Sequence, residues 1–159
     1  MNTHTDLRGR TIDLAVLDSS ELKLFRQLQK DAVKMDTAAY RNHWIGKVSE
    51  LLSARGLSKS EIVSSPLYRL AQDLGSRQQV ERGEARVPDY RDELEGIIVS
   101  RFKTRRAFCE ATGLSEDMLS HVLARRKHLA IDTLTEALSR VGYQLRIAPL
   151  SKKLAESVE

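Results

Sequence analysis

The chain has 159 residues, enough for one compact domain or two small ones. Its 41% hydrophobic and 30% charged residues are ordinary for a folded protein in water, and its 5% aromatic residues are too few for a platform on which single-stranded bases stack. A single cysteine, Cys109, excludes an internal disulfide framework and a zinc site built from several cysteines.

The net charge and the lengths of the apolar runs bear on the partners and the location of the protein. The net charge of +4 is compatible with nucleic-acid binding without demonstrating it. No apolar run near the start is long enough for a signal peptide, and none later approaches the length of a membrane span. We therefore expect a cytoplasmic protein.

The first part of the chain predicts a tail followed by helices. Residues 1–17 are polar apart from a brief apolar patch, Ile12 to Leu17, so we expect a flexible tail there, with a short strand-like or docking segment as an alternative. Residues 18–85 predict an N-terminal helical region. Its first helix begins at Ser19 or Ser20 and carries apolar residues on one face, at positions 22, 25, 28 and 33. A second helix runs from Thr37 to Arg55, with Trp44 on its apolar stripe as a core anchor.

A second glycine turn follows, but it does not repeat the motif described below. Residues 56–58 have the same sequence as residues 113–115, yet Pro66 would fall in the interior of the next helix, where proline removes a hydrogen bond and clashes. We expect Ser58 to cap one short helical turn and Ser65 to cap a new helix that begins at Pro66. The polar residues 76–90 then predict a boundary between two halves.

The second half, residues 86–150, contains two short helices joined by a glycine. Thr104 can cap the first helix, Gly113 can end it in the left-handed conformation, and Ser115 can cap the second. The second helix has an apolar face at positions 118, 119, 122 and 123. This pattern is typical of a helix-turn-helix, whose second helix enters the DNA major groove. After a further helix, alternation over residues 143–147 predicts a short strand, and residues 151–159 predict a frayed tail.

Residues 93–148, a little over a third of the chain, resemble the lambda-repressor-like family of Cro/C1-type, Xre-like DNA-binding domains. Members carry a small residue before the turn glycine, two aliphatic positions in the second helix, a basic exit loop and then another helix. The matching positions here are Cys109, Gly113, Leu119, Val122, residues 125–127 and Ile131. The chain departs from the pattern with cysteine for alanine at 109, threonine for an aliphatic residue at 112, and arginine for the glycine often found at 125.

Basic residues lie on both sides of the motif, where a docked helix-turn-helix meets the DNA backbone. The residues predicted to contact phosphates are Lys103, Thr104, Arg105, Arg106, Arg125, Arg126 and Lys127. The exposed positions of the second helix are predicted to contact bases, and these are Ser115, Glu116, Asp117, Ser120 and His121. The two acids have an alternative role, because negative charge stabilises the start of a helix.

No pattern of catalytic or metal-binding residues is found in the sequence. The four histidines lack the spacing of metal ligands on one helix face, and no glycine-rich phosphate loop or nucleophile motif is present. We therefore expect no enzyme activity, no metal and no cofactor.

These observations predict an all-α protein with an N-terminal helical region and a lambda-repressor-like domain that ends in a short strand. The expected function is sequence-specific binding of double-stranded DNA as a dimeric transcriptional repressor, because one helix contacts too few base pairs for useful discrimination. Two alternatives stay open. One is an antitoxin that neutralises a toxin partner through its N-terminal half and represses its own operon, as members of the family it resembles often do. The other is a helical adaptor that binds only protein.

Overall fold

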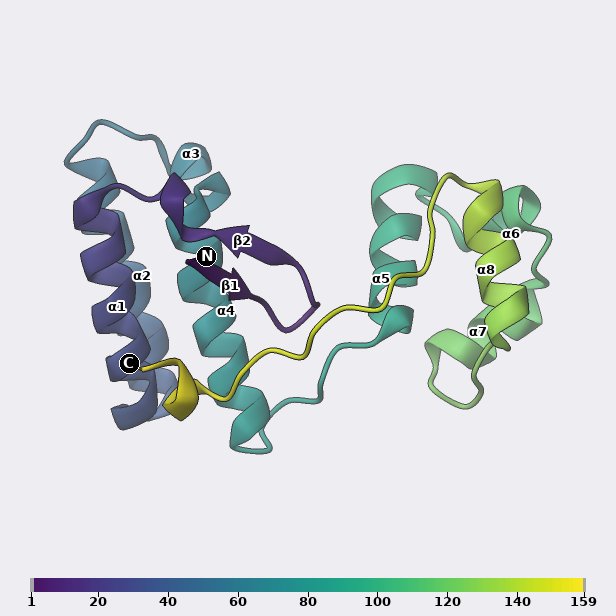
Figure 1. Ribbon diagram of the computed structural model, residues 1–159. Helices are drawn as coiled ribbons and strands as arrows, with labels where there is room; N and C mark the ends of the chain where they lie inside the picture. Colours follow the sequence, from purple (N-terminus) through teal and green to yellow (C-terminus); the bar gives the residue numbers. More distant parts are fainter. Residues whose placement is uncertain (1, 159) are drawn as a thin grey trace. The chain divides into compact units, whose positions relative to one another are not determined.

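A computed structural model describes residues 2–158 and is mostly helical (Figure 1). The chain forms two compact units. The first unit comprises residues 1–87 and 148–159, and the second comprises residues 88–147. The chain therefore leaves the first unit, forms the second and returns to the first. Both halves are helical as predicted, but the C-terminal segment is part of the first unit.

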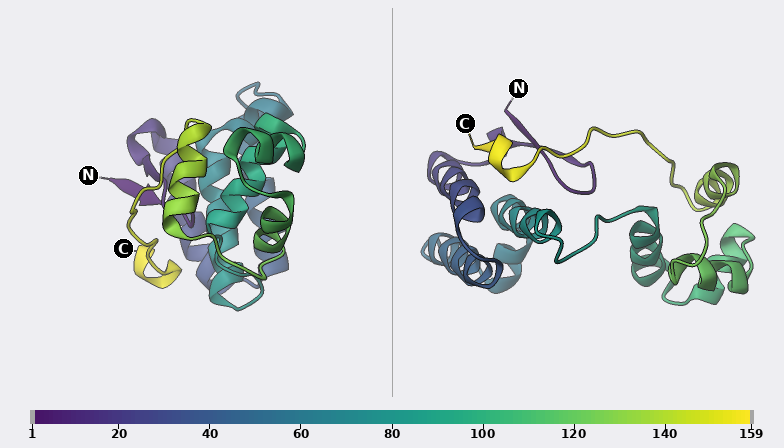
Figure 2. Two further views of the ribbon diagram at one scale, coloured as in Figure 1. Left: turned by 90° about the vertical axis from the view of Figure 1, so that its right-hand side faces the viewer. Right: turned by 90° about the horizontal axis from the view of Figure 1, so that it is seen from below.

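The first unit combines a small hairpin with a helical bundle. Its elements in chain order are β1 (Thr3–Thr5), β2 (Thr11–Asp13), the 3-10 turn η1 (Leu14–Val16), α1 (Ser19–Lys34), α2 (Thr37–Ser53), α3 (Lys59–Ser64), α4 (Pro66–Glu81) and the 3-10 turn η3 (Leu154–Ser157). The two strands are antiparallel, with His4 opposite Ile12. The right-hand view of Figure 2 looks nearly along the axes of the long helices.

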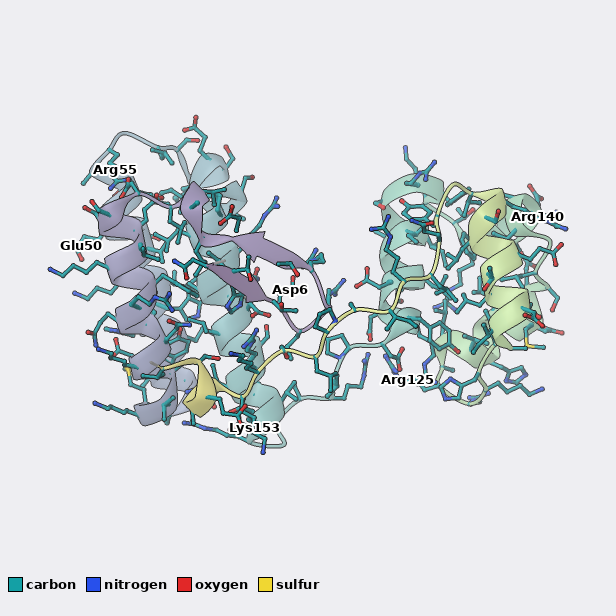
Figure 3. The ribbon with its side chains drawn as sticks, viewed as in Figure 1. Asp6, Glu50, Arg55, Arg125, Arg140 and Lys153 are labelled. Carbon is teal, nitrogen blue, oxygen red and sulfur yellow. The ribbon has the colours of Figure 1, made fainter. Side chains whose placement is uncertain are left out.

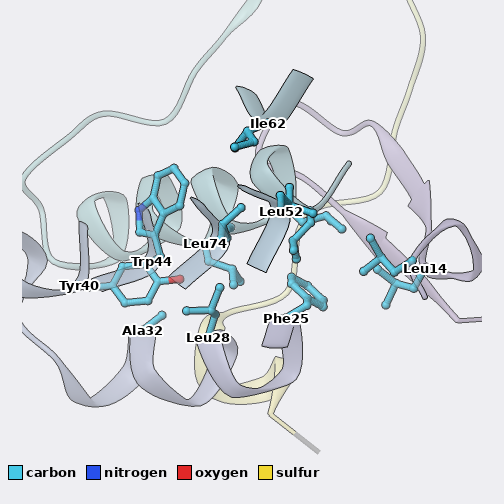
Figure 4. Close-up of a cluster of buried hydrophobic side chains, with 14 of the residues drawn as sticks. Leu14, Phe25, Leu28, Ala32, Tyr40, Trp44, Leu52, Ile62 and Leu74 are labelled. Atoms are coloured by element: carbon cyan, nitrogen blue, oxygen red, sulfur yellow. The ribbon is translucent and has the colours of Figure 1, made fainter. Parts of the chain in front are cut away.

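One hydrophobic core holds α1, α2 and α4 together (Figure 4). Phe25 and Leu28 of α1 and Tyr40 of α2 are fully buried in it. Trp44 is 5% exposed and its ring meets that of Tyr68 edge-on, with centroids 4.9 Å apart. The predicted role of this tryptophan as a core anchor is therefore confirmed.

The helix starts in the first unit are set by local capping groups. The Ser58 hydroxyl accepts from the Glu61 N–H while the Glu61 carboxylate accepts from the Ser58 N–H, which satisfies two otherwise unpaired donors. Ser65 caps α4 by accepting from the Tyr68 N–H at 3.2 Å, with Pro66 at the first helical position. Both predicted starts are confirmed. Helix α4 continues to Glu81, however, so only the part of the predicted boundary at 76–90 that lies between this helix and the next is outside regular structure.

The prediction of a flexible tail over residues 1–17 was wrong, and the alternative of a strand-like docking segment is what the described residues form. The hairpin packs onto the bundle, with Leu14 and His4 buried. The Asp73 carboxylate of α4 accepts from the Leu7 N–H at 3.0 Å and lies 2.7 Å from His4 Nε2. Each strand has only three residues, too few for a clear alternation, and the groups that hold them are more than 60 positions away in the sequence.

The prediction of a frayed tail over residues 151–159 was also wrong for residues 151–158, and residue 159 lies outside the described residues. Leu154 of η3 is 3% exposed and belongs to the core of the first unit. Its N–H donates to the Glu81 carboxylate at 2.7 Å, and the Lys152 carbonyl accepts from Arg77 at 2.9 Å. One buried leucine in a polar segment gives no periodicity, which is why the sequence pattern did not indicate this contact.

The second unit contains four α-helices among the described residues. They are α5 (Tyr90–Ile97), α6 (Arg105–Thr112), α7 (Glu116–Leu123) and α8 (Ile131–Arg140), and a π-helical turn, η2 (Ile98–Phe102), extends α5. Leu94, Phe108, Leu119 and Val122 are the most buried residues of a separate hydrophobic core. Two cores of this kind explain why the chain divides into two units.

The predicted short strand over residues 143–147 is not formed. This segment has no regular secondary structure and pairs with no strand among the described residues. Tyr143 and Leu145 are partly exposed and Ile147 is fully exposed. An alternating sequence makes a segment suitable for a strand, but a strand requires a hydrogen-bonding partner.

Because Leu154 packs in the core of the first unit, its replacement by a smaller residue is predicted to lower stability. We expect Leu154→Ala to lower the free energy of unfolding of the first unit by about 2 kcal/mol, because it opens a cavity in the core. Denaturant unfolding followed by the fluorescence of Trp44, which lies in the same core, measures this change.

Leu150→Ala is the matched control. Leu150 is 94% exposed, so its replacement should change the free energy by less than about 0.5 kcal/mol. Equal effects of the two substitutions would contradict the packing of residues 148–158 against the bundle.

Candidate nucleic-acid interface

The turn between α6 and α7 is built around Gly113. Its φ of 79° lies in the left-handed region, where residues with a side chain are strained, and its N–H donates to the Cys109 carbonyl at 2.8 Å. A side chain at this position would also displace the Arg140 guanidinium, which is the end of a flexible side chain and can move aside. The predicted glycine turn is therefore present, and its left-handed conformation is what favours glycine there.

The helix after the turn is capped and amphipathic as predicted. The Ser115 hydroxyl accepts from the Met118 N–H at 3.1 Å and begins α7. Leu119 and Val122 are fully buried in the core of the second unit. With these two residues fixed inside, the opposite side of α7 has to face outward.

The five residues predicted to contact bases lie on that outward side or at its edge. Glu116, Asp117 and Ser120 are exposed, and His121 is half-buried. Ser115 is exposed too; its oxygen is used by the helix cap, while its O–H can still donate. The side chains of Glu116 and Asp117 occupy the first turn, where negative charge stabilises the positive end of the helix dipole.

The basic residues before α6 are exposed. Thr104 caps α6 by accepting from the Ala107 N–H at 3.2 Å. Lys103 and Arg105 are exposed on either side of this cap. Arg106 pairs with Glu110 at 3.4 Å, but its side chain is 80% exposed, so this pair contributes little to stability and can open easily.

The basic residues after α7 lie in a tight exit turn. The His121 carbonyl accepts from the N–H groups of Arg126 and Lys127, at 2.9 and 3.3 Å. Both basic side chains are exposed. The turn also places Arg125 at a φ of 63°, in the left-handed region that glycine adopts more easily than a residue with a side chain.

Arg125 has a different environment from the other predicted phosphate contacts. Its side chain is labelled in Figure 3. The guanidinium donates to Asp89 at 2.7 Å and to both carboxylate oxygens of Asp92 at 3.0 Å. These carboxylates start α5, so the pair fixes the exit turn of α7 to another helix. Hydrogen bonding from Arg91, opposed by partial burial and assisted by Arg125, lowers the pKa of the Asp89 carboxyl well below its usual value. We therefore leave Arg125 out of the proposed phosphate contacts.

Arg140 is a second structural arginine that sequence reasoning missed. Its guanidinium donates to the Thr112 carbonyl at 3.1 Å and to Glu136 at 2.7 Å (Figure 3). A positive charge at the C-terminal end of α6 stabilises that end of the helix. The acids at positions 89 and 92 indicate a helix start, but nothing near them or near Arg140 in the sequence indicates the distant contacts of these two arginines.

Cys109 is a core residue, as the sequence predicted. Its side chain is buried beside Phe108, and burial, assisted by the nearby Glu116 charge, raises the pKa of its thiol. A thiol that stays protonated is a poor nucleophile. In residues 2–158, no group of three or more histidine, cysteine or acidic side chains is arranged to hold a metal ion.

Comparison of the chain with protein families, with curated proteins and with solved structures gives no match. Within the described part of the chain, no helix combines the length and the apolar character that crossing a membrane requires.

The ion pairs of Arg125 predict a stability effect in the second unit. We expect Arg125→Gln to lower its free energy of unfolding by about 1 kcal/mol, because two partly buried carboxylates each lose one ion-pair partner. Native-state hydrogen exchange of the amides in α5 and α7 measures this unit separately from the other.

Arg126→Gln removes the same charge one residue later. Its side chain is exposed, so hydrogen exchange should change by the equivalent of less than about 0.5 kcal/mol. A loss of the same size in both variants would show that Arg125 has no positioning role.

Proposed function

We propose that the second unit binds double-stranded DNA in a sequence-specific manner and that the protein acts as a dimeric transcriptional repressor. The observation that carries this proposal is the outward polar side of α7, with exposed basic residues before α6 and after α7. The resemblance to lambda-repressor-like domains supports it, because α6, the Gly113 turn and α7 follow the order of a helix-turn-helix.

Phosphate contacts would come from the two exposed basic groups. Lys103, Arg105 and Arg106 lie at the start of α6, and Arg126 and Lys127 lie after α7. Guanidinium and ammonium groups on both sides of an inserted helix fix its position on the duplex and supply most of the affinity. The Thr104 hydroxyl, next to these groups, can donate to a phosphate oxygen while it caps α6.

Base contacts would come from the exposed part of α7. Ser120 and His121 can both donate to acceptors in the major groove, and Glu116 or Asp117 can accept from the amino group of cytosine. Both acids also stabilise the start of α7. A carboxylate close to the duplex disfavours base sequences that offer it no hydrogen-bond donor. Selectivity is therefore expected to depend more on these four residues than affinity does.

A dimer follows from the small size of one recognition helix. α7 has eight residues, and a helix of this length reaches only a few base pairs. Two copies on neighbouring half-sites would provide the discrimination that a repressor requires. The helices of the first unit and the exposed apolar residues of 145–147 are the candidate dimer surfaces.

The phosphate contacts predict a salt-dependent loss of affinity. We expect Arg105→Ala with Arg126→Ala to weaken binding to all duplexes alike and to reduce the slope of log affinity against log salt by about 2 per protomer. Gel-shift titrations at several salt concentrations measure both quantities on duplexes taken from a random-site selection.

Lys23→Ala with Lys30→Ala is the control, because it removes two exposed charges of the first unit. It should leave the salt slope unchanged. Unchanged affinity in the arginine double variant would count against DNA binding by this surface and would favour a protein-binding adaptor.

The base contacts predict a change of preference at His121. We expect His121→Ala to alter the sequences recovered from a random pool while total affinity falls less than tenfold, since a single base contact is worth about 1–3 kcal/mol at the preferred site only. Sequencing the selected duplexes for both proteins checks this.

His43→Ala provides the comparison. His43 bonds to Asp31 at 2.9 Å inside the first unit, so its loss should leave the selected sequences unchanged. Identical selections for the wild type and His121→Ala would remove His121 from the base-contacting set.

A further inference from the structure

The first unit contains a cavity of about 530 Å³ that the proposed DNA binding does not use. Its walls come from β1, from Arg26 and Gln29 of α1, from Arg77 of α4 and from residues 149–157. This volume lies within the usual range for small-molecule sites. Because segments from both ends of the chain and from two helices form its walls, the cavity exists only in the folded unit.

Arg77 brings a buried positive charge to this cavity. Its side chain is 3% exposed, lies 2.9 Å from the Asp73 carboxylate and donates to the carbonyls of Lys152 and Thr5. His4 Nε2 lies 2.7 Å from the same carboxylate, which can only accept, so this nitrogen donates there and cannot also accept from Arg77. A guanidinium has five N–H donors, so Arg77 keeps donors beyond the three acceptors that it contacts.

Gln29 adds hydrogen-bond donors to the wall of the cavity. The residue is 4% exposed, and its Oε1 accepts from Arg26 at 3.2 Å. Its amide nitrogen has two N–H donors, and neither has an acceptor among residues 2–158. A ligand group that accepts hydrogen bonds can pair with these donors inside the cavity.

The charges around the cavity favour an anion. Among the described residues of its wall, Glu156 is the one acid, and Arg26, Arg77 and Lys152 are positive; because Asp73 offsets the charge of Arg77, the excess positive charge comes from Arg26 and Lys152. We infer that this cavity binds a small organic anion whose carboxylate or phosphate group accepts from Gln29 and the two arginines. The assignment does not depend on DNA binding, since every residue in it belongs to the first unit.

The test is calorimetric titration of the full chain with inorganic phosphate and, separately, with citrate as a carboxylate probe. The wild type is expected to bind one of the two at a single site, and the preferred probe identifies the group. Gln29→Glu should weaken that binding at least tenfold, because it has the same size and places a negative charge against the anion. The new carboxylate can pair with Arg26, so the fold is expected to persist.

Two further variants make the result decisive. Arg26→Gln, at the half-buried edge of the cavity, should weaken binding several-fold without disturbing the buried Arg77 pair. Arg69→Gln removes the same charge from an exposed position of α4 outside the cavity wall and should leave binding unchanged. Failure of both probes to bind at millimolar concentration would overturn the inference, and so would equal affinities of the wild type and Arg26→Gln.

Discussion

The first unit depends on the buried ion pair between Asp73 and Arg77 on α4. Asp73 holds the N-terminal hairpin through His4 and Leu7, while Arg77 holds the returning C-terminal segment through Lys152. Charged side chains are rarely this buried unless they are paired, and removal of one partner would leave an uncompensated charge in the interior. A single turn of one helix therefore attaches both ends of the chain to the bundle.

The attachment of both terminal segments to α4 also bears on how the chain connects the two units and on the cavity of the first unit. The second unit is joined to the first at both of its ends, because the chain returns after residue 147. The same contacts form part of the walls of the cavity, in which Arg77 and Gln29 keep hydrogen-bond donors available. A ligand there would bind between segments that only the folded chain brings together.

In the second unit, the orientation of α7 is fixed by what lies at its two ends. Gly113 adopts the left-handed conformation that redirects the chain, and Arg125 ties the exit turn to the start of α5. Leu119 and Val122 bury the inner side of the helix. The polar side of α7 therefore faces outward, as the proposed contact with a duplex requires.

The sequence by itself determined most of the helices, because their signals are local. Serine caps at 58, 65 and 115, the glycine at 113 and the apolar stripes depend on residues within a few positions of one another. The same reasoning located the exposed side of α7 and the basic residues beside it, and so most of the candidate site. Only the tertiary structure decided the hairpin at the start, the burial of Leu154 and the use of Arg125 and Arg140 within the fold. These features depend on partners 28 to 75 positions away in the sequence, and neither periodicity nor capping contains information about such distant contacts.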